Sequence, residues 1–299
     1  MSSLLWWLTT GVVLAACVLP AWALEVRETT VGTEKRVTVT SRHFDVTFTS
    51  LGGRVVSFVE KPAGREHVLW APGEGGWFDD RGTRTMAQYD VAFAHRDAQA
   101  VELVYSVTDD VGLRWKKTYA AADALPGLRV SYEVTNGSGQ AREYEQMIRN
   151  FITPEQGLTV FCHSDQGVQK FPWGDWGRKQ AQSEWISRVA GDWLGLLRSS
   201  GGGLAIVCSP LSKIYLWTKS PRGTFEPVFP KITLEPGQSV QARVTVVPVS
   251  DFTDLADATD DYLLGFSYVE KVKEFTFQNR LMPISARFAT PQKVTVRTQ

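Results

Sequence analysis

Short segments that alternate apolar and polar residues recur along most of this 299-residue chain, and they constrain its fold more than any other feature. The segments are rich in Val, Thr, Phe and Tyr, and a period of two places successive side chains on opposite faces of a strand. Clear examples are Phe44–Phe48, Arg54–Val59, Ala100–Tyr105, Leu128–Val134 and Gln241–Val246. Turn residues separate the segments at Gly52-Gly53, Pro62-Ala63-Gly64, Asn136-Gly137, Gly201-Gly202-Gly203 and Pro236-Gly237. Short connections of this kind predict antiparallel meanders.

One segment, Asp254–Phe266, has the pattern of a helix. The residues that would share its apolar face are Leu255, Ala258, Tyr262 and Phe266. No linker rich in Pro, Ser or Gly divides the remainder, and no internal repeat is present. We therefore predict a single all-β domain over residues 24–299, with large packed antiparallel sheets and few short helices.

The charge balance argues against a protein that binds polyanions. The chain carries 32 Lys+Arg and 32 Asp+Glu, so no broad positive field is available for nucleic acid or anionic lipid. The histidines stand singly and have no metal-ligand spacing to a cysteine or to one another; they are His43, His67, His95 and His163. We expect no zinc site and no cofactor.

The first 23 residues predict export. They contain no charged side chain, carry an apolar run from Leu4 to Leu19, and end in the small residues that signal peptidase needs. We favour cleavage, which gives a periplasmic or secreted protein with no membrane span, over retention as an anchor. The sequence Leu14-Ala15-Ala16-Cys17 also resembles the bacterial lipobox, so a lipoprotein anchored at Cys17 is the alternative.

The exported chain retains two cysteines, Cys162 and Cys208. An oxidising compartment would allow a disulfide between them. The sequence leaves open whether they pair or remain two buried free thiols.

Two blocks of sequence carry a resemblance to a known superfamily. In the first, Phe44–Phe58, a Gly-Gly-Arg turn links two strands, and Gly64-Arg65-Glu66 follows. In the second, Thr224–Pro230, a glutamate stands among aromatic and proline residues, and a Leu-x-Pro-Gly turn comes next at Leu234–Gly237. The blocks resemble those of the galactose mutarotase-like superfamily, which includes aldose 1-epimerases, and occur in the same order. The resemblance implies a twisted antiparallel β-supersandwich.

The resemblance also implies roles for particular residues. In the mutarotase mechanism a glutamate takes the proton from the anomeric hydroxyl and a histidine protonates the ring oxygen. Glu226 matches the base, whereas Arg149 or Asn150 stands where the imidazole is expected. His163, with Asp165 to orient it, is the nearby histidine that could act as the acid. Arg149 could instead bind the carboxylate or sulfate of an acidic sugar, because guanidinium presents a planar fork.

Further candidate binding residues come from two glycine-flanked segments. Superfamily members have an arginine in the loop after the first strands, and Arg81 or Arg84 is the nearest match. Sugars stack their C–H faces on indole rings, and their hydroxyls need carboxylates and amides. The residues that offer this combination are Trp173, Asp175 and Trp176. Trp115, by contrast, is expected in the core.

These observations favour an exported protein that binds a mono- or oligosaccharide, with or without aldose epimerase-like turnover by a glutamate base. The alternative is a noncatalytic interaction domain of the cell envelope with the same sandwich. A serine hydrolase is excluded, because no nucleophile-elbow motif is present and Ser209 lacks the flanking glycines.

Overall fold

The computed structural model describes residues 23–61, 63–71, 74–80, 82–152, 157–173, 182–219, 222–250, 252–271 and 274–283. Residues 1–22, including Cys17, lie outside this part of the chain. Strands make up 68% of the structure, and the one helix among the described residues is the short 3-10 helix η1 (Gly82–Met86). None of the described segments is a helix of the length and apolar character that a membrane crossing requires. The prediction of an all-β fold is confirmed.

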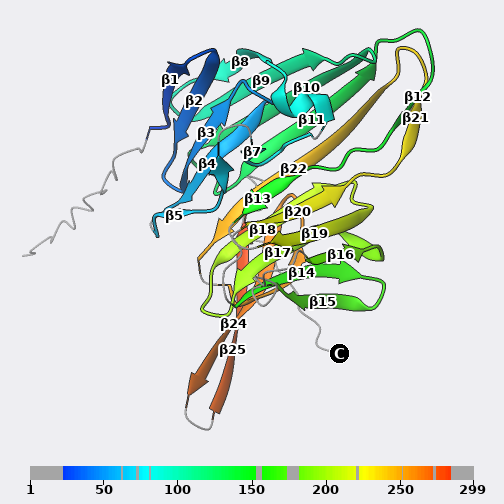
Figure 1. Cartoon of the computed structure of the whole chain (residues 1–299). Helices are drawn as coiled ribbons and strands as arrows, with labels where there is room; N and C mark the ends of the chain where they lie inside the picture. The colour runs from blue at the N-terminus through cyan, green and yellow to red at the C-terminus, as the bar shows by residue number, and fades with distance from the viewer. Residues whose placement is uncertain are drawn as a thin grey trace, which may run out of the picture.

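A nine-stranded antiparallel sheet runs the length of the molecule (Figure 1). Its strands, in spatial order, are β15 (Gly167–Pro172), β14 (Leu158–Ser164), β17 (Val189–Arg198), β18 (Gly203–Ser209), β22 (Ser239–Val249), β11 (Leu128–Asn136), β10 (Leu113–Ala122), β9 (Ala100–Thr108) and β8 (Asp90–Arg96). Each predicted strand of this region falls inside one of these elements. The long β22 joins the two halves, because it pairs with β18 on one side and β11 on the other.

Two smaller sheets pack side by side on one face of the nine-stranded sheet (Figure 1). The five-stranded sheet contains β1 (Glu25–Val31), β2 (Glu34–Thr40), β3 (Phe44–Thr49), β4 (Arg54–Glu60) and β5 (Arg65–Glu66). The four-stranded sheet contains β13 (Asn150–Ile152), β20 (Arg222–Val228), β19 (Lys213–Lys219) and β16 (Gln182–Ile186). Two short two-stranded pairs complete this layer. Neighbours in sequence form the first, β6 (Trp70–Ala71) with β7 (Glu74–Gly75), and distant segments form the second, β12 (Arg142–Tyr144) with β21 (Ile232–Leu234).

The main core fills the space between these layers. Alternate residues of the facing strands meet there, as the period of two predicts, and aromatic side chains occupy much of it. Phe48 of β3 packs on Tyr119 of β10 with ring centroids 4.7 Å apart. At the other end, Ile152 of β13 lies beside Leu158 and Leu196 of the large sheet. The molecule is therefore a two-layer sandwich in which each sheet has one inner and one outer face.

A second, smaller core lies on the outer face of the nine-stranded sheet. A three-stranded sheet covers that face near β14, β17 and β18. Its strands are β23 (Asp254–Ala258), β24 (Tyr262–Lys271) and β25 (Glu274–Pro283), and the β24–β25 hairpin projects beyond the sandwich in Figure 1. Leu255 and Leu263 are buried there against Phe161 and Trp193.

The helix predicted over Asp254–Phe266 is wrong, because β23, a turn and the start of β24 occupy that range. The turn is closed by Thr259, whose hydroxyl accepts the backbone N–H groups of Asp261 and Tyr262 at 3.2 Å. Turn chemistry of Thr and Asp therefore outweighs the helical spacing. The apolar face of the large sheet supplies the second reason, since it buries Leu255 equally well when that residue is on a strand.

The paired glycines of the first block make the turn that their sequence predicts. Gly52 and Gly53 have φ angles of +72° and +54°, in the left-handed region that favours glycine. A Cβ on Gly52 would lie 2.6 Å from the carbonyl oxygen of Thr85. The turn therefore tolerates no side chain at this position.

The structure shows Cys162 and Cys208 as buried free thiols. Cys162 lies on β14 and Cys208 on β18, and β17 runs between these two strands. Two strand spacings amount to about 9.6 Å, which exceeds the Cα separation that a disulfide spans. Burial raises the pKa of the Cys162 thiol to about 11 and that of Cys208 well above its usual value.

These pKa shifts predict unreactive thiols in the folded protein. In a Cys17→Ser variant at pH 8, about one Cys162 side chain in a thousand would be thiolate, the form that attacks thiol reagents. Dithionitrobenzoate should therefore label neither cysteine in the native protein and both after addition of urea without reductant. Rapid native labelling would contradict the burial, and absence of labelling in urea would indicate a disulfide.

Candidate functional site

The four-stranded sheet has one face in the core and one face turned away from it. On β20, Phe225 belongs to the main core, so Thr224 and Glu226 project from the opposite face. On β19, Ile214 and Leu216 belong to the core, and Lys213, Tyr215 and Trp217 project outward by the same alternation. We call this second surface the outer face of the four-stranded sheet.

One line of side chains crosses this outer face from strand to strand. Trp185 of β16 pairs with Tyr215 of β19, and Tyr215 pairs with Glu226 of β20. Asn150 pairs with Phe225, and Met147 forms a bridge with Val228. Both pairs belong to one antiparallel register, and in that register Arg149 lies opposite Glu226. On the side of Arg149 away from Glu226, Asp79 pairs with Arg149 in an isolated antiparallel β-bridge. The resulting line, which we call the Glu226 row, consists of Asp79, Arg149, Glu226, Tyr215 and Trp185.

Arg149 is held by Asp79. The two residues exchange backbone hydrogen bonds of 3.1 and 3.0 Å, and the Arg149 Nε donates to Asp79 Oδ2 at 2.9 Å. The Nη2 group donates to the same oxygen, and the hydroxyl of Thr85 donates to Asp79 Oδ1 at 2.6 Å. The Arg149 guanidinium also lies 4.9 Å from the ring centroid of Phe151. These contacts fix a positive group next to Glu226.

Asn150, the other residue at the expected imidazole position, points into the sandwich instead. Its Oδ1 accepts the backbone N–H of Phe78 at 2.9 Å, and its Nδ2 donates to carbonyl oxygens of Ile148 and Phe225 at 3.2 Å. Asn150 therefore holds backbone segments together, and of the two candidates only Arg149 faces outward.

Accessibility increases along the Glu226 row toward β16. Glu226 is 3% exposed, and its Oε1 accepts the Thr224 hydroxyl at 2.7 Å. Trp185, two strands away, is 50% exposed. Its ring packs on Tyr215, with centroids 4.6 Å apart at 41°, and the Lys213 ammonium lies 5.2 Å from the indole centroid. The row thus has a buried acid at its floor and an open aromatic platform at its edge.

A buried ammonium positions the Asp79 end of the row. Lys117 of β10 points into the core, where its Nζ donates to the carbonyl oxygens of Gly52, Gly53 and Phe78 at 3.1, 3.0 and 2.7 Å. It also forms an ion pair of 2.6 Å with Asp80. Burial lowers the pKa of the Lys117 ammonium, and the charge of Asp80 opposes that shift.

Phe78 links this buried pair to the outer face. Its φ of +61° is unusual for a bulky residue, and the Lys117 and Asn150 hydrogen bonds to its carbonyl and N–H groups hold that conformation. The two acids that follow Phe78 diverge. Asp79 reaches Arg149, whereas Asp80 turns inward to Lys117, Tyr89 and Gln146.

The structure does not bring His163 to Glu226. His163 follows Phe161 on the same face of β14, and Phe161 belongs to the core beneath the three-stranded sheet. A Cβ on Gly191 would meet both the His163 Cβ at 3.0 Å and the Trp193 Nε1 of that core at 3.3 Å. The four-stranded sheet packs on the opposite side of β14, so the whole sandwich separates His163 from Glu226. The predicted acid and base therefore cannot act on one sugar.

The other predicted binding residues divide into three groups. Trp173 is 0% exposed and belongs to the main core, a placement that does not support the stacking role. Arg84 of η1 lies over Trp115 at 3.9 Å and donates to the Asp109 carboxylate at 3.3 Å and to the Asp80 carbonyl at 3.1 Å, so its guanidinium already has structural partners. Arg81, Asp175 and Trp176 lie outside the described residues, so their roles stay predictions. Trp115 is buried in the core, as expected.

Sequence reasoning did not select Asp79, Tyr215 or Trp185. A signal for Tyr215 is present, because the apolar residues Ile214 and Leu216 alternate with Tyr215 and Trp217. That alternation predicts an aromatic outer face on this strand. Which strand faces it, and therefore the role of Trp185, depends on pairing between segments distant in the sequence.

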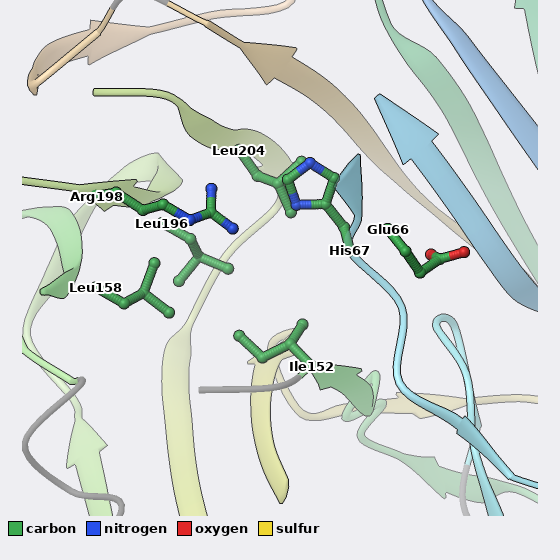
Figure 2. A pocket seen from close by; sticks show the side chains of 7 residues that line it. All are labelled: Glu66, His67, Ile152, Leu158, Leu196, Arg198 and Leu204. Atoms are coloured by element: carbon green, nitrogen blue, oxygen red, sulfur yellow. The ribbon is translucent and has the colours of Figure 1, made fainter. Parts of the chain in front are cut away.

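A cavity between the layers is too small for a sugar. It has a volume of about 30 Å³, whereas ligand sites usually measure roughly 300–1,000 Å³, so it suits only water. Figure 2 shows His67 and Arg198 at this cavity and the Glu66 carboxylate pointing away from it. His67 Nε2 is 2.9 Å from Glu60 Oε2, and Glu66 accepts the N–H groups of Phe58 and Val68 at 2.8 Å. These polar groups have structural partners.

A larger open groove of about 350 Å³ crosses the outer face of β8 to β11. Its polar lining includes Asp90, Ser106, Arg114, Lys116, Glu133 and Thr135. The one aromatic residue beside it, Trp115, turns its indole inward and donates to Asp109 at 2.9 Å. The groove therefore lacks the open aromatic face that the Glu226 row has.

Comparison with known proteins identifies the fold. No protein-family model matches the chain, and no curated protein sequence matches it. A galactose mutarotase-like protein from Clostridium acetobutylicum is similar in structure, with a TM-score of 0.61, 12% identity, and coverage of 76% of this chain and 99% of that one. A galactose mutarotase-like protein from Lactobacillus casei is also similar, with a TM-score of 0.55, 13% identity, and coverage of 71% of this chain and 99% of that one.

A TPR-domain containing protein from Parabacteroides distasonis also matches, with a TM-score of 0.57, 15% identity, and coverage of 72% of this chain and 47% of that one. This chain therefore spans about half the length of that protein. The likenesses define the class: the fold is the galactose mutarotase-like β-supersandwich that the two sequence blocks predicted. A fold of this kind occurs in proteins with several different functions, so the function of this protein depends on the residues of the Glu226 row.

The buried Lys117–Asp80 pair gives a prediction for stability. Lys117→Met leaves Asp80 without its cation and the carbonyls of Gly52, Gly53 and Phe78 without their donor, which should cost about 3–5 kcal/mol of unfolding free energy. Urea denaturation followed by tryptophan fluorescence measures this loss.

The matched comparison is the double variant Lys117→Met with Asp80→Asn. Removing both charges should cost less than the sum of the two single substitutions, because neither partner then remains as a buried unpaired charge. Strict additivity of the two losses would show that the ion pair does not couple these segments.

Proposed function

We propose that this protein binds carbohydrate on the outer face of the four-stranded sheet and does not turn it over. One observation carries the proposal: the Glu226 row brings a carboxylate, a guanidinium, a phenol and a half-exposed indole into register on one face. Sugars need this combination, because their hydroxyls hydrogen-bond to charged groups and their C–H faces stack on rings. The galactose mutarotase-like fold is consistent with a sugar ligand.

The positions of the histidines favour binding without turnover. All four histidines of the sequence fall within the described residues, and none lies on the outer face of the four-stranded sheet. His67 pairs with Glu60 in the interior, His95 with Asp97 on the surface, and His163 lies across the sandwich. The group beside Glu226 is the guanidinium of Arg149, and a guanidinium is a poor general acid. The row can therefore bind and orient a sugar without supplying the acid that ring opening requires.

Titration of intrinsic tryptophan fluorescence with a panel of mono- and oligosaccharides tests the binding. At least one sugar should produce a saturable change, and Glu226→Gln should weaken its affinity by about tenfold or more, because a charged hydrogen-bond acceptor is lost. The control is Glu133→Gln, a partly exposed acid on the outward face of β11, which should leave the affinity unchanged. A flat response to every sugar would contradict the proposal and favour an interaction domain.

Polarimetry on freshly dissolved α-sugars tests the lack of turnover. The protein should leave the rate of mutarotation at the buffer value for any sugar that it binds. Acceleration that Glu226→Gln abolishes would show that the protein is an epimerase after all.

The proposal includes export, with residues 1–23 removed as a secretory signal. Intact-mass measurement of the protein recovered from the producing cell's envelope and medium should give a chain that begins at Leu24. A mass that corresponds to a lipidated N-terminal Cys17 would replace this route with the lipoprotein alternative. A chain that retains residues 1–16 would contradict both.

A further inference from the structure

Trp185 is open to solvent, yet it is held in place by its neighbours. Tyr215 packs on one part of the indole, and the Lys213 ammonium lies over the ring. Lys213 is itself fixed, because its Nζ donates to Glu145 Oε1 at 2.9 Å. An exposed indole with restrained orientation differs from a scattered surface aromatic, because the entropy of ordering it has already been lost before a ligand arrives.

The register places this platform at a definite distance from Glu226. Strands in a sheet lie about 4.8 Å apart, so Tyr215 is one strand spacing from Glu226 and Trp185 is two, or about 9.6 Å at the backbone. A pyranose ring is about as wide as one strand spacing. A single sugar that contacts Arg149 above the buried Glu226 carboxylate therefore reaches Tyr215 but does not cover the outer part of Trp185.

We infer that Trp185 and Tyr215 form a second sugar subsite, so that the ligand is an oligosaccharide that runs across the strands from Glu226 toward β16. This inference rests on the proposed function, because the first subsite is the one at Glu226 and Arg149. Half of the Trp185 residue is exposed beside Tyr215 and Lys213, and the C–H face of the second sugar stacks on that exposed part of the indole. The ligand class is thus an oligosaccharide of at least two units.

The test compares monosaccharides with their own disaccharides. Glucose, maltose, cellobiose, galactose and a β-linked galactobiose are titrated by calorimetry into the wild-type protein and into Trp185→Ala. For the sugar that binds, the wild type should prefer the disaccharide to the monosaccharide by about tenfold. Trp185→Ala should remove that preference, because it weakens binding of the disaccharide by about tenfold more than binding of the monosaccharide.

Two further variants separate stacking from other effects. Trp185→Phe retains a ring and should restore most of the preference, whereas Met86→Ala, which truncates another exposed apolar side chain, should have no effect. Urea midpoints of all variants show that each is folded; an exposed position should change them little.

The outcomes distinguish the two proposals. If the monosaccharide and disaccharide bind equally well, or if Trp185→Ala weakens both alike, the second subsite is overturned and binding at Glu226 stands. If Glu226→Gln leaves every affinity unchanged, the proposed function fails and the subsite fails with it. Absence of binding by all five sugars also overturns both.

Discussion

The buried Lys117 ammonium joins the three parts of the chain that define this site. It donates hydrogen bonds to the carbonyl oxygens of the Gly52-Gly53 turn of the five-stranded sheet and of Phe78, and it forms an ion pair with Asp80. Its own strand lies in the large sheet. A lysine is rarely buried unless it is paired, because desolvation of the charge is expensive. Here four oxygen partners offset that cost. The same contacts require Phe78 to adopt the conformation that sends Asp79 outward and Asp80 inward.

From that point the geometry of the sandwich determines what the outer face can do. Asp79 fixes Arg149, Arg149 stands beside Glu226, and strand register extends the line to Tyr215 and Trp185. Because one carboxylate lies on each side of Arg149, its charge is largely compensated within the row. The row therefore suits the many hydroxyls of a neutral sugar better than it suits an isolated anion. The guanidinium of Arg149 taken alone would favour an acidic sugar instead.

The sequence was sufficient for the fold because the period of two and the turn residues agree with each other over most of the chain. Gly52-Gly53 illustrates this agreement, since the turn permits no side chain and the motif that resembles the superfamily is the turn itself. The sequence-based prediction failed at Asp254–Phe266. The spacing of apolar residues there is compatible with a helix, but the segment packs as strands on an apolar face of the large sheet. Local pattern cannot reveal that second partner.

The candidate site was predictable only in part for the same reason. Glu226 and Arg149 were selected from sequence, but they become neighbours through the pairing of β13 with β20, in which Asn150 faces Phe225 across a separation of 75 positions. His163 was selected for its nearness in sequence, and the alternation along β14 places it on the other side of the sandwich. Trp185 acquires its role from Tyr215 and Glu226, and its own neighbours in sequence do not indicate it.

Fluorine NMR of the protein labelled with 5-fluorotryptophan, with each resonance assigned by substitution, tests most directly which face binds the ligand. When the oligosaccharide that binds is added, the account predicts a saturable shift of the Trp185 resonance, while those of Trp115 and Trp173 in the core remain in place. A titration in which Trp185 does not respond and Trp115, beside the groove on the large sheet, does respond would contradict it.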